Sequence, residues 1–242
     1  MDTVLEKCKR LSLNAVAGHL EQALKQAKLS NWPFEKMLDD LLEREIERRT
    51  QNRIALRFKQ SKLAEKITID QFDFSYHPSR KENKNRILSL MNQEFIREHA
   101  DVILIGNPGV GKTYLAKCIA YTATQAQTKV LFTTAMDMIN QLVAAEADKS
   151  LLKKLQTYQT PELLVVDELG YLPLGTQGSN LFFQVISARH AKKSTMITTN
   201  LPFANWADIF DSTTVATAIA DRLVYKSEVL IMKGESYRKK AT

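Results

Sequence analysis

The sequence predicts an α/β domain with a five-stranded parallel sheet between helices, preceded by a small all-α domain. From residue 86 onward, short apolar or β-branched runs alternate with segments of helical character. Continuous apolar strands separated by helices are typical of a parallel sheet that is covered on both faces. Upstream, apolar residues recur at helical spacing instead. The chain has 242 residues, of which 44% are hydrophobic, enough for one sizeable α/β domain and a smaller appendage.

The N-terminal part is expected to hold two helices and a linker. Helical periodicity runs through residues 1–28, and "SNWP" then interrupts it. A long helix is expected from Pro33 to about Lys62, since proline is tolerated in a first helical turn. The stretch that follows loses the period and contains turn-forming residues, so we expect a linker that docks through Phe72 and Phe74. The predicted domains are therefore 1–66 (helical), 67–85 (linker) and 86–242 (α/β).

The α/β part divides into strands and crossover helices. The runs with strand character are 101–105, 129–133, 162–167, 194–199 and 228–232. The helix-like segments between them lie near 112–126, 135–156, 179–192 and 213–225. Because crossovers between parallel strands are right-handed, this order fixes most of the topology.

The first strand runs directly into "GNPGVGKT", residues 106–113, which is the pattern G-x-x-x-x-G-K-[ST] between a strand and a helix. Its glycines let successive backbone N–H groups face one point, and the helix adds its positive N-terminal end. Lys112 can reach the β- and γ-phosphates of a nucleotide, and the Thr113 hydroxyl can ligate Mg²⁺. The candidate nucleotide contacts are Gly106, Asn107, Pro108, Gly109, Val110, Gly111, Lys112, Thr113 and Tyr114.

Two acids with different roles are expected in "LLVVDELGYLPL", residues 163–174. Adjacent strand residues point to opposite faces. Asp167 ends the strand that we expect beside the phosphate loop, where it can hold Mg²⁺ directly or through water. Glu168 then points differently and can polarise the water that attacks the γ-phosphate. Asn200, at the tip of the next strand, can orient that water without adding charge. The alternatives are that Asn200 is an ordinary turn residue at a strand end, and that the two acids are simply solvated.

Charge is distributed unevenly along the chain. The formal net charge is +7, and residues 48–64 carry six basic side chains and no acid. Arg49, Arg53 and Arg57 recur at i, i+4 and i+8, so they would form one stripe on a helix. Such a stripe suits contacts with the phosphates of double-stranded DNA. The alternatives are a solvated helix face, or ion pairs from Glu45 to the two nearest arginines. The candidate DNA contacts are Arg48, Arg49, Arg53 and Arg57.

Composition also excludes some classes of protein. The two cysteines, Cys8 and Cys118, lie far apart and are expected to be reduced, buried thiols. The N-terminal "MDTVLEKCKR" is polar, and no apolar run approaches the roughly 18 residues of a membrane span. We therefore expect a soluble cytoplasmic protein without a membrane partner.

The motifs together resemble the IstB-like ATPases, AAA+ proteins of bacterial insertion sequences that are similar to the DnaC helicase loader. The resemblance is carried by "GNPGVGKTYLA", "LLVVDELGYLPL", "LFFQVISARH", "TTNLPFANWADIF", "AIADRLVYKSEVL" and "KGESYR", and it extends over nearly the whole chain. The phosphate loop is shared by many NTPases, whereas "DELGYLPL" and "GESYR" are far more specific. Asn107 stands where members often have proline, and Tyr225–Lys226 stand where a histidine pair is common, which puts any role of those histidines in doubt here.

The resemblance implies an AAA+ fold, ATP and Mg²⁺ as cofactors, and a homo-oligomer with shared ATP sites in the bacterial cytoplasm or nucleoid. It assigns Arg222 in "ADRL" as an arginine finger for a neighbouring subunit, although a helical arginine after an aspartate is otherwise often a surface ion pair. Only ten residues follow the last strand, so we expect no helical lid. Arg238 in "GESYR" can contact phosphate or DNA, or be solvated.

These observations lead to one main hypothesis and three rivals. The main one is a DNA-dependent AAA+ ATPase that assembles on target DNA with ATP and regulates a partner transposase. The same site would serve a DnaC-like helicase loader, but the linker and "DELGYLPL" favour transposition. A metabolic phosphate-loop kinase would need an acceptor-binding region and an arginine-rich lid, and the sequence shows neither. A nucleotide-gated DNA-binding scaffold with negligible turnover is disfavoured by Glu168.

Overall fold

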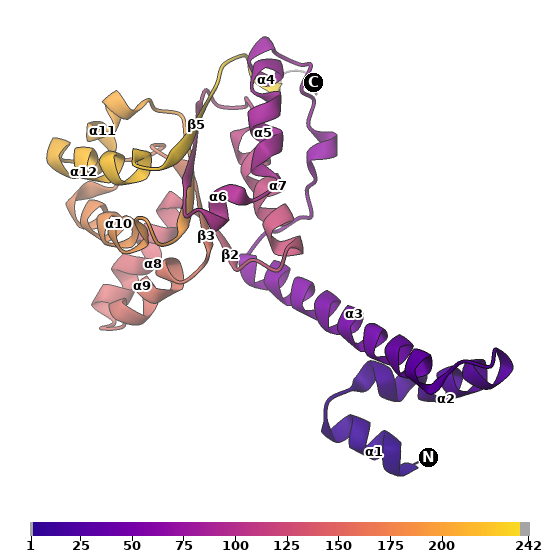
Figure 1. The fold of residues 1–242 in the computed structure, drawn as a ribbon. Coiled ribbons are helices and arrows are strands. Elements are labelled where there is room, and N and C mark those ends of the chain that lie inside the picture. Colours follow the sequence, from indigo (N-terminus) through magenta and orange to yellow (C-terminus); the bar gives the residue numbers. More distant parts are fainter. Residues whose placement is uncertain (1, 238–242) are drawn as a thin grey trace. The chain divides into compact units, whose positions relative to one another are not determined.

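The structure, a computed structural model, describes residues 2–237, which form two compact units (Figure 1). One unit ends at Leu56 and the other begins at Arg57, so the division falls inside the long helix α3 (Phe34–Ser61), upstream of the expected boundary at residue 66. Among the described residues, no helix is both long and apolar enough to cross a membrane.

The N-terminal unit consists of α1 (Asp2–Arg10), α2 (Asn14–Leu29) and the first part of α3. Helix α3 agrees with its prediction to within one residue at each end. The buried apolar side chains of this unit form a small core of Cys8, Val16, Leu20, Ala23 and Leu41.

The expectation of one helix over residues 1–28 is wrong, because the chain turns between α1 and α2. Ser12 adopts a left-handed conformation with φ 57°, and the N–H of Leu13 donates to the Cys8 carbonyl at 2.8 Å. The N–H of Ser12 also donates to the Lys9 carbonyl at 2.9 Å. These two bonds form a Schellman motif, which ends a helix by satisfying its last carbonyls. The motif normally uses glycine, so a serine at this position gives no signal in the sequence.

The second unit is built on a parallel five-stranded sheet with the order β2-β3-β4-β1-β5. The strands are β1 (Asp101–Gly106), β2 (Val130–Thr134), β3 (Leu163–Leu169), β4 (Ser194–Thr199) and β5 (Ser227–Met232). The five expected strands are confirmed. In this order β4 lies between β3, which carries Asp167, and β1, which leads into the phosphate loop. An apolar run predicts a buried strand, but it does not predict which position in the sheet the next strand takes after its crossover helix.

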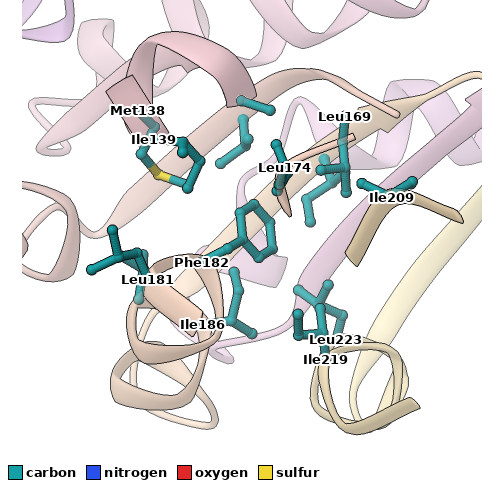
Figure 2. Packing of buried hydrophobic residues seen from close by; sticks show 14 of the residues in the cluster. Met138, Ile139, Leu169, Leu174, Leu181, Phe182, Ile186, Ile209, Ile219 and Leu223 are labelled. Carbon is teal, nitrogen blue, oxygen red and sulfur yellow. The ribbon is translucent and has the colours of Figure 1, made fainter. Parts of the chain in front are cut away.

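Helices cover both faces of the sheet (Figure 1). One face is covered by α8 (Ala135–Ala147), α9 (Leu151–Gln159), α10 (Gly175–Arg189), α11 (Ala207–Phe210, after the short turn η2, Phe203–Asn205) and α12 (Thr213–Val224). Phe182 lies in the middle of this layer, and Figure 2 shows it among Met138, Ile186 and Leu223. The other face is covered by α5 (Lys84–Leu90), α6 (Glu94–Arg97) and α7 (Lys112–Gln125).

The expected helix over residues 135–156 is in fact two helices, α8 and α9. Lys149 is left-handed with φ 55°, and the N–H of Ser150 donates to the Ala145 carbonyl at 2.8 Å. The N–H of Lys149 donates to the Glu146 carbonyl at 3.1 Å. This is again a Schellman motif without glycine. Both missed helix ends thus have the same physical cause.

The expected linker docks on the second unit as predicted. It contains a short turn, η1 (Ile69–Gln71), and a short helix, α4 (Pro78–Glu82). Phe72 is buried in the core beneath α7, and Phe74 packs against that core. Docking through these two rings is therefore confirmed.

Side chains of α4 and α5 contact the outer side of β5. Arg86 donates to the Val229 carbonyl at 2.8 Å and forms an ion pair with Glu228 at 2.6 Å. The Ile231 carbonyl accepts from Ser79 Oγ at 3.4 Å and from Asn83 Nδ2 at 3.3 Å. The last strand is thereby held along the side that faces away from β1.

A buried network joins the starts of the strands. The Arg189 guanidinium, almost fully buried, donates to the carbonyls of Tyr158 (3.0 Å) and Pro161 (2.8 Å) and to Thr195 Oγ1 (3.0 Å). The Asp101 carboxylate accepts from the Thr195 N–H at 2.6 Å. Burial raises the pKa of Asp101 to about 7, whereas the bond from Thr195 and the charge of Arg189 act in the opposite direction. The network ties β1, β4, α10 and the segment before β3 together.

Candidate nucleotide site

The loop between β1 and α7 has the backbone that its glycines require. Gly109 and Gly111 have φ values of +81° and +105°, a region that side chains rarely adopt. A Cβ on Gly109 would lie 2.1 Å from Ser236 Oγ, and one on Gly111 would lie 2.9 Å from Phe72 Cε2. The loop is therefore restricted to glycine by its own conformation and by the segments packed on it.

A cavity of about 240 Å³ lies against this loop. The loop contributes Gly109, Gly111, Lys112, Thr113 and Tyr114 to its lining. Glu168, Thr198 and Thr199, from the ends of β3 and β4, line it as well. Within the described chain, the remaining candidates do not line the cavity and instead form the body of the loop: Gly106, Asn107, Pro108 and Val110.

Lys112 is buried and directed into its own loop. Its ammonium group donates to the carbonyl of Gly106 at 2.6 Å and to that of Asn107 at 3.0 Å. A buried ammonium group at the start of α7 places a positive charge where the helix dipole is also positive. The site is therefore built for an anion such as a phosphate chain.

Asp167, on β3, and Thr113, in the first turn of α7, meet although β4 separates β3 from β1. Thr113 Oγ1 donates to Asp167 Oδ1 at 3.0 Å, and Asp167 is 3% exposed. A carboxylate and a hydroxyl side by side next to a phosphate site fit Mg²⁺, which prefers oxygen ligands. Within residues 2–237, no group of three or more His, Cys, Asp or Glu side chains could hold a metal ion. The residues of this chain that would hold a cation here are Thr113 and Asp167.

Glu168 directly follows Asp167 but lies in different surroundings, since Asp167 is buried and Glu168 is not. Its side chain is exposed and lines the cavity. Its backbone is left-handed, with φ +61°, and the pairing of β3 with β4 shifts register between Val166 and Leu169. Such a conformation costs on the order of 1–3 kcal/mol and persists only where the surroundings impose it. The fold thus places an exposed carboxylate at the cavity while its neighbour stays buried.

Thr198 is a site residue that the sequence reasoning missed. Its hydroxyl donates to Asp167 Oδ1 and accepts the N–H of Glu168 at 2.9 Å. It therefore connects the two acids and holds the irregular backbone between them. The available signal was the hydroxyl run "TT" directly before Asn200, at the end of the strand that precedes this candidate residue.

Asn200 and Arg222 lie outside the cavity lining of the described chain. Asn200 directly follows Thr199, and its Oδ1 is buried without a hydrogen-bond partner among residues 2–237. Arg222 lies on α12, where its guanidinium donates to the Ala218 carbonyl at 2.8 Å and lies 4.7 Å from the Phe183 ring centroid. Arg238 lies outside the described residues.

The basic segment engages in local contacts. Glu45 is buried, and its carboxylate pairs with Arg48 at 2.9 Å and with Arg49 at 2.8 Å, which is the ion pairing considered as an alternative. These bonds lower the pKa of Glu45 to about 2. Arg53 is exposed on α3. Arg57 donates from Nε to the Gln127 carbonyl at 3.0 Å. Since a guanidinium has five donors, these contacts leave room for phosphate.

Comparison with known proteins gives consistent matches. The family model described as "IstB-like ATP binding protein" matches residues 6–242. The ATP-binding protein of insertion sequence IS5376 from Geobacillus stearothermophilus is 37% identical over 237 residues, covering 98% of this chain and 94% of that protein. The ATP-binding protein of insertion sequence IS21 from Pseudomonas aeruginosa is 36% identical over 231 residues, covering 96% and 86%.

Solved structures are similar in fold. The DnaC helicase loader matches with a TM-score of 0.59 and 24% identity, covering 69% of this chain and 96% of that one. The AMPPCP-bound DnaA from Aquifex aeolicus matches with a TM-score of 0.60 and 15% identity, covering 74% and 54%. At these identities the likeness shows the fold, which is that of AAA+ phosphate-loop NTPases.

Proposed function

This chain belongs to the family of IstB-like ATP-binding proteins, and from that premise we propose that it is a DNA-dependent ATPase that assembles on target DNA and regulates a partner transposase. The chain is an AAA+ ATPase by family and fold. What supports the finer function is that its similar relatives are named as ATP-binding proteins of insertion sequences. A mobile element needs a transposase, which supports a partner of that kind for an ATPase encoded with the element.

The observation that carries the hydrolytic part is the contact between Thr113 and Asp167 beside a cavity that Glu168 also lines. Thr113 and Asp167 would hold Mg²⁺, which when bound would neutralise charge on the β- and γ-phosphates. Lys112 would leave its loop carbonyls to pair with the same phosphates. Glu168 would polarise the attacking water, and Asn200 would help to orient it. Arg222 of a neighbouring subunit would stabilise the charge that builds up on the γ-phosphoryl oxygens.

The DNA part of the proposal rests on the N-terminal helical domain, residues 1–66. Its candidate contacts are Arg48, Arg49, Arg53 and Arg57. They would bind phosphates, so the affinity would be similar for all duplex sequences. Assembly on the duplex would bring Arg222 of one subunit to the nucleotide of its neighbour. The ATP sites of the homo-oligomer would then be shared between adjacent subunits. Residues 67–85 would then transmit assembly to the ATPase domain, residues 86–242.

Helicase loading remains the second candidate, because the DnaC helicase loader shares the fold. The nucleotide site is the same in both proposals, and only the partner differs. The names of the relatives favour the transposase.

The test is steady-state ATP hydrolysis with and without duplex DNA, and then with the transposase of the same element or a replicative helicase. We expect DNA to stimulate hydrolysis and the transposase to be activated only in the presence of ATP. Lys112→Ala should lose ATP affinity, whereas Glu168→Gln should bind ATP, hydrolyse it slowly and accumulate on DNA. Hydrolysis indifferent to DNA would favour the kinase hypothesis, negligible hydrolysis with and without DNA would favour the scaffold, and activation of the helicase alone would favour the loader.

A further inference from the structure

The phosphate loop is clamped by two segments that lie outside it in the sequence, and residues of both, among them Phe72, Arg80 and Tyr237, also line the cavity. The first is the linker from Phe72 to Arg80, and the second is the C-terminal run 233–237. Arg80 on α4 is 4% exposed, and its guanidinium donates to the carbonyl of Asp73 at 2.9 Å and to that of Val110, in the phosphate loop, at 2.9 Å.

Three aromatic rings surround this guanidinium. Its Cζ lies 4.4 Å from the ring centroid of Phe72, 4.9 Å from that of Tyr237 and 5.1 Å from that of Tyr76. Contacts of this kind are favourable for a cation that has lost its water. Burial lowers the pKa of Arg80, although a guanidinium group is effectively always protonated in proteins. The charge is thus held in place by rings and carbonyls.

The C-terminal run binds the neighbouring peptide of the loop, between Gly109 and Val110. The N–H of Tyr237 donates to the Gly109 carbonyl at 2.9 Å. Tyr76 connects the two segments, since its hydroxyl donates to the Ser236 carbonyl at 3.1 Å and its ring meets Tyr237 edge-on at 4.8 Å. The linker and the C-terminal run therefore form a single clamp.

The geometry of a trans peptide gives this clamp a consequence. In a planar trans peptide, the C=O of one residue and the N–H of the next point in opposite directions. Arg80, by holding the Val110 carbonyl, fixes the N–H of Gly111 on the side away from itself. Tyr237, by holding the Gly109 carbonyl, does the same for the N–H of Val110. Successive N–H groups of this loop are the donors that a phosphate chain needs.

We propose that Arg80 is a positioning residue that, together with the Tyr237 backbone, orients the Val110 and Gly111 amides of the phosphate loop for the nucleotide's phosphates. The inference rests on ATP binding by this chain. It makes the linker and the C-terminal run part of the nucleotide site although they act from outside the loop.

The experiment measures dissociation constants of the full-length chain for ATP, tripolyphosphate and adenosine. Arg80→Gln should weaken ATP and tripolyphosphate equally, by about 10- to 100-fold, since bonds from a charged donor are removed, and should leave adenosine unchanged. Arg80→Lys should weaken them as well, because an ammonium lacks the fork that reaches two carbonyls and the plane that stacks on rings. Arg97→Gln, at an exposed arginine of the same unit, is the control and should match the wild type.

Other outcomes would overturn the inference. A loss confined to ATP and adenosine would mean that Arg80 contacts the base. Full rescue by lysine would mean that its charge acts on phosphate directly. A lower melting temperature with unchanged dissociation constants for the folded fraction would mean a purely structural role. Failure of the wild type to bind ATP would count against the proposed function itself, because the clamp is tested only relative to that binding.

Discussion

At the scale of single residues, Thr198 shows how one hydroxyl can support two acids with different roles. It donates to the buried Asp167 and accepts from the backbone of the exposed Glu168. Both bonds act where the left-handed backbone of Glu168 separates the two carboxylates. The pair of acids is thus arranged by a neighbouring strand as well as by its own.

Thr198→Val keeps the size of the side chain but removes this bridge. We expect hydrolysis to slow by on the order of 10- to 100-fold, because small misplacements of catalytic groups have effects of that size, while ATP affinity changes little. Thr198→Ser should retain most of the activity. The matched control is Thr133→Val, a buried threonine on β2 outside the cavity lining of the described chain. Equal rates for Thr198→Val and wild type would remove Thr198 from the site.

At the scale of elements, the strands and the phosphate loop could be predicted, whereas their neighbours in space could not. Apolar runs mark buried strands, and a glycine pattern marks a loop with positive φ. The place of β4 between β3 and β1 depends on crossovers, which leave no mark in composition. Arg80 and Thr198 are site residues only because distant segments meet, and the two helix breaks use Ser12 and Lys149 where glycine would have signalled a turn.

Helix α12 carries Arg222, and the proposal that it acts on a neighbouring subunit makes a prediction for mixtures. Arg222→Ala should bind nucleotide but be nearly inactive, since loss of an arginine finger costs about 10³-fold or more in rate. Mixed with Lys112→Ala, it should regain part of the activity, because an intact site and an intact finger then meet at one interface. Mixtures shown to co-assemble that remain inactive would contradict action between subunits.

Helix α3 carries the candidate DNA contacts, and their charge can be tested separately from their ion pairs. Replacing Arg49, Arg53 and Arg57 together with glutamine should weaken binding to all duplexes. It should also flatten the dependence of log affinity on log salt, by about 0.9 for each phosphate that is no longer neutralised. The triple lysine variant should keep the slope although it disturbs the bond to Glu45. Glutamine and lysine both favour helix, so α3 should persist. An unchanged slope in the glutamine variant would identify an ordinary solvated surface.

At the scale of the whole molecule, the buried network at the starts of the strands links stability to pH. The native carboxyl of Asp101, with its pKa raised from 3.8 to about 7, binds its proton more tightly than the unfolded one. Its contribution to stability is therefore fully present below pH 3.8 and is lost as pH rises through 7. The bonds of Arg189 to backbone carbonyls do not depend on this proton, so they still connect α10 to the segment before β3 after Asp101 has ionised.

Asp101→Asn keeps the acceptor for Thr195 but cannot titrate. Between about pH 4 and pH 8, the unfolding free energy of the variant should rise relative to the wild type, by at most about 4 kcal/mol. Urea denaturation at several pH values measures this difference, and Asp148→Asn, at an exposed carboxyl, is the control. Parallel curves for the Asp101 variant and the wild type would show that the proton is not coupled to folding.

The contacts of Ser79, Asn83 and Arg86 with the outer carbonyls of β5 have a consequence for how copies of this chain can associate. An outermost strand with vacant carbonyls is a template for backbone pairing with another chain, which leads to sheet extension and aggregation. Here side-chain donors already occupy the carbonyls of Val229 and Ile231. If copies of this chain assemble on one duplex as proposed above, they would therefore not join by extending the sheet at β5.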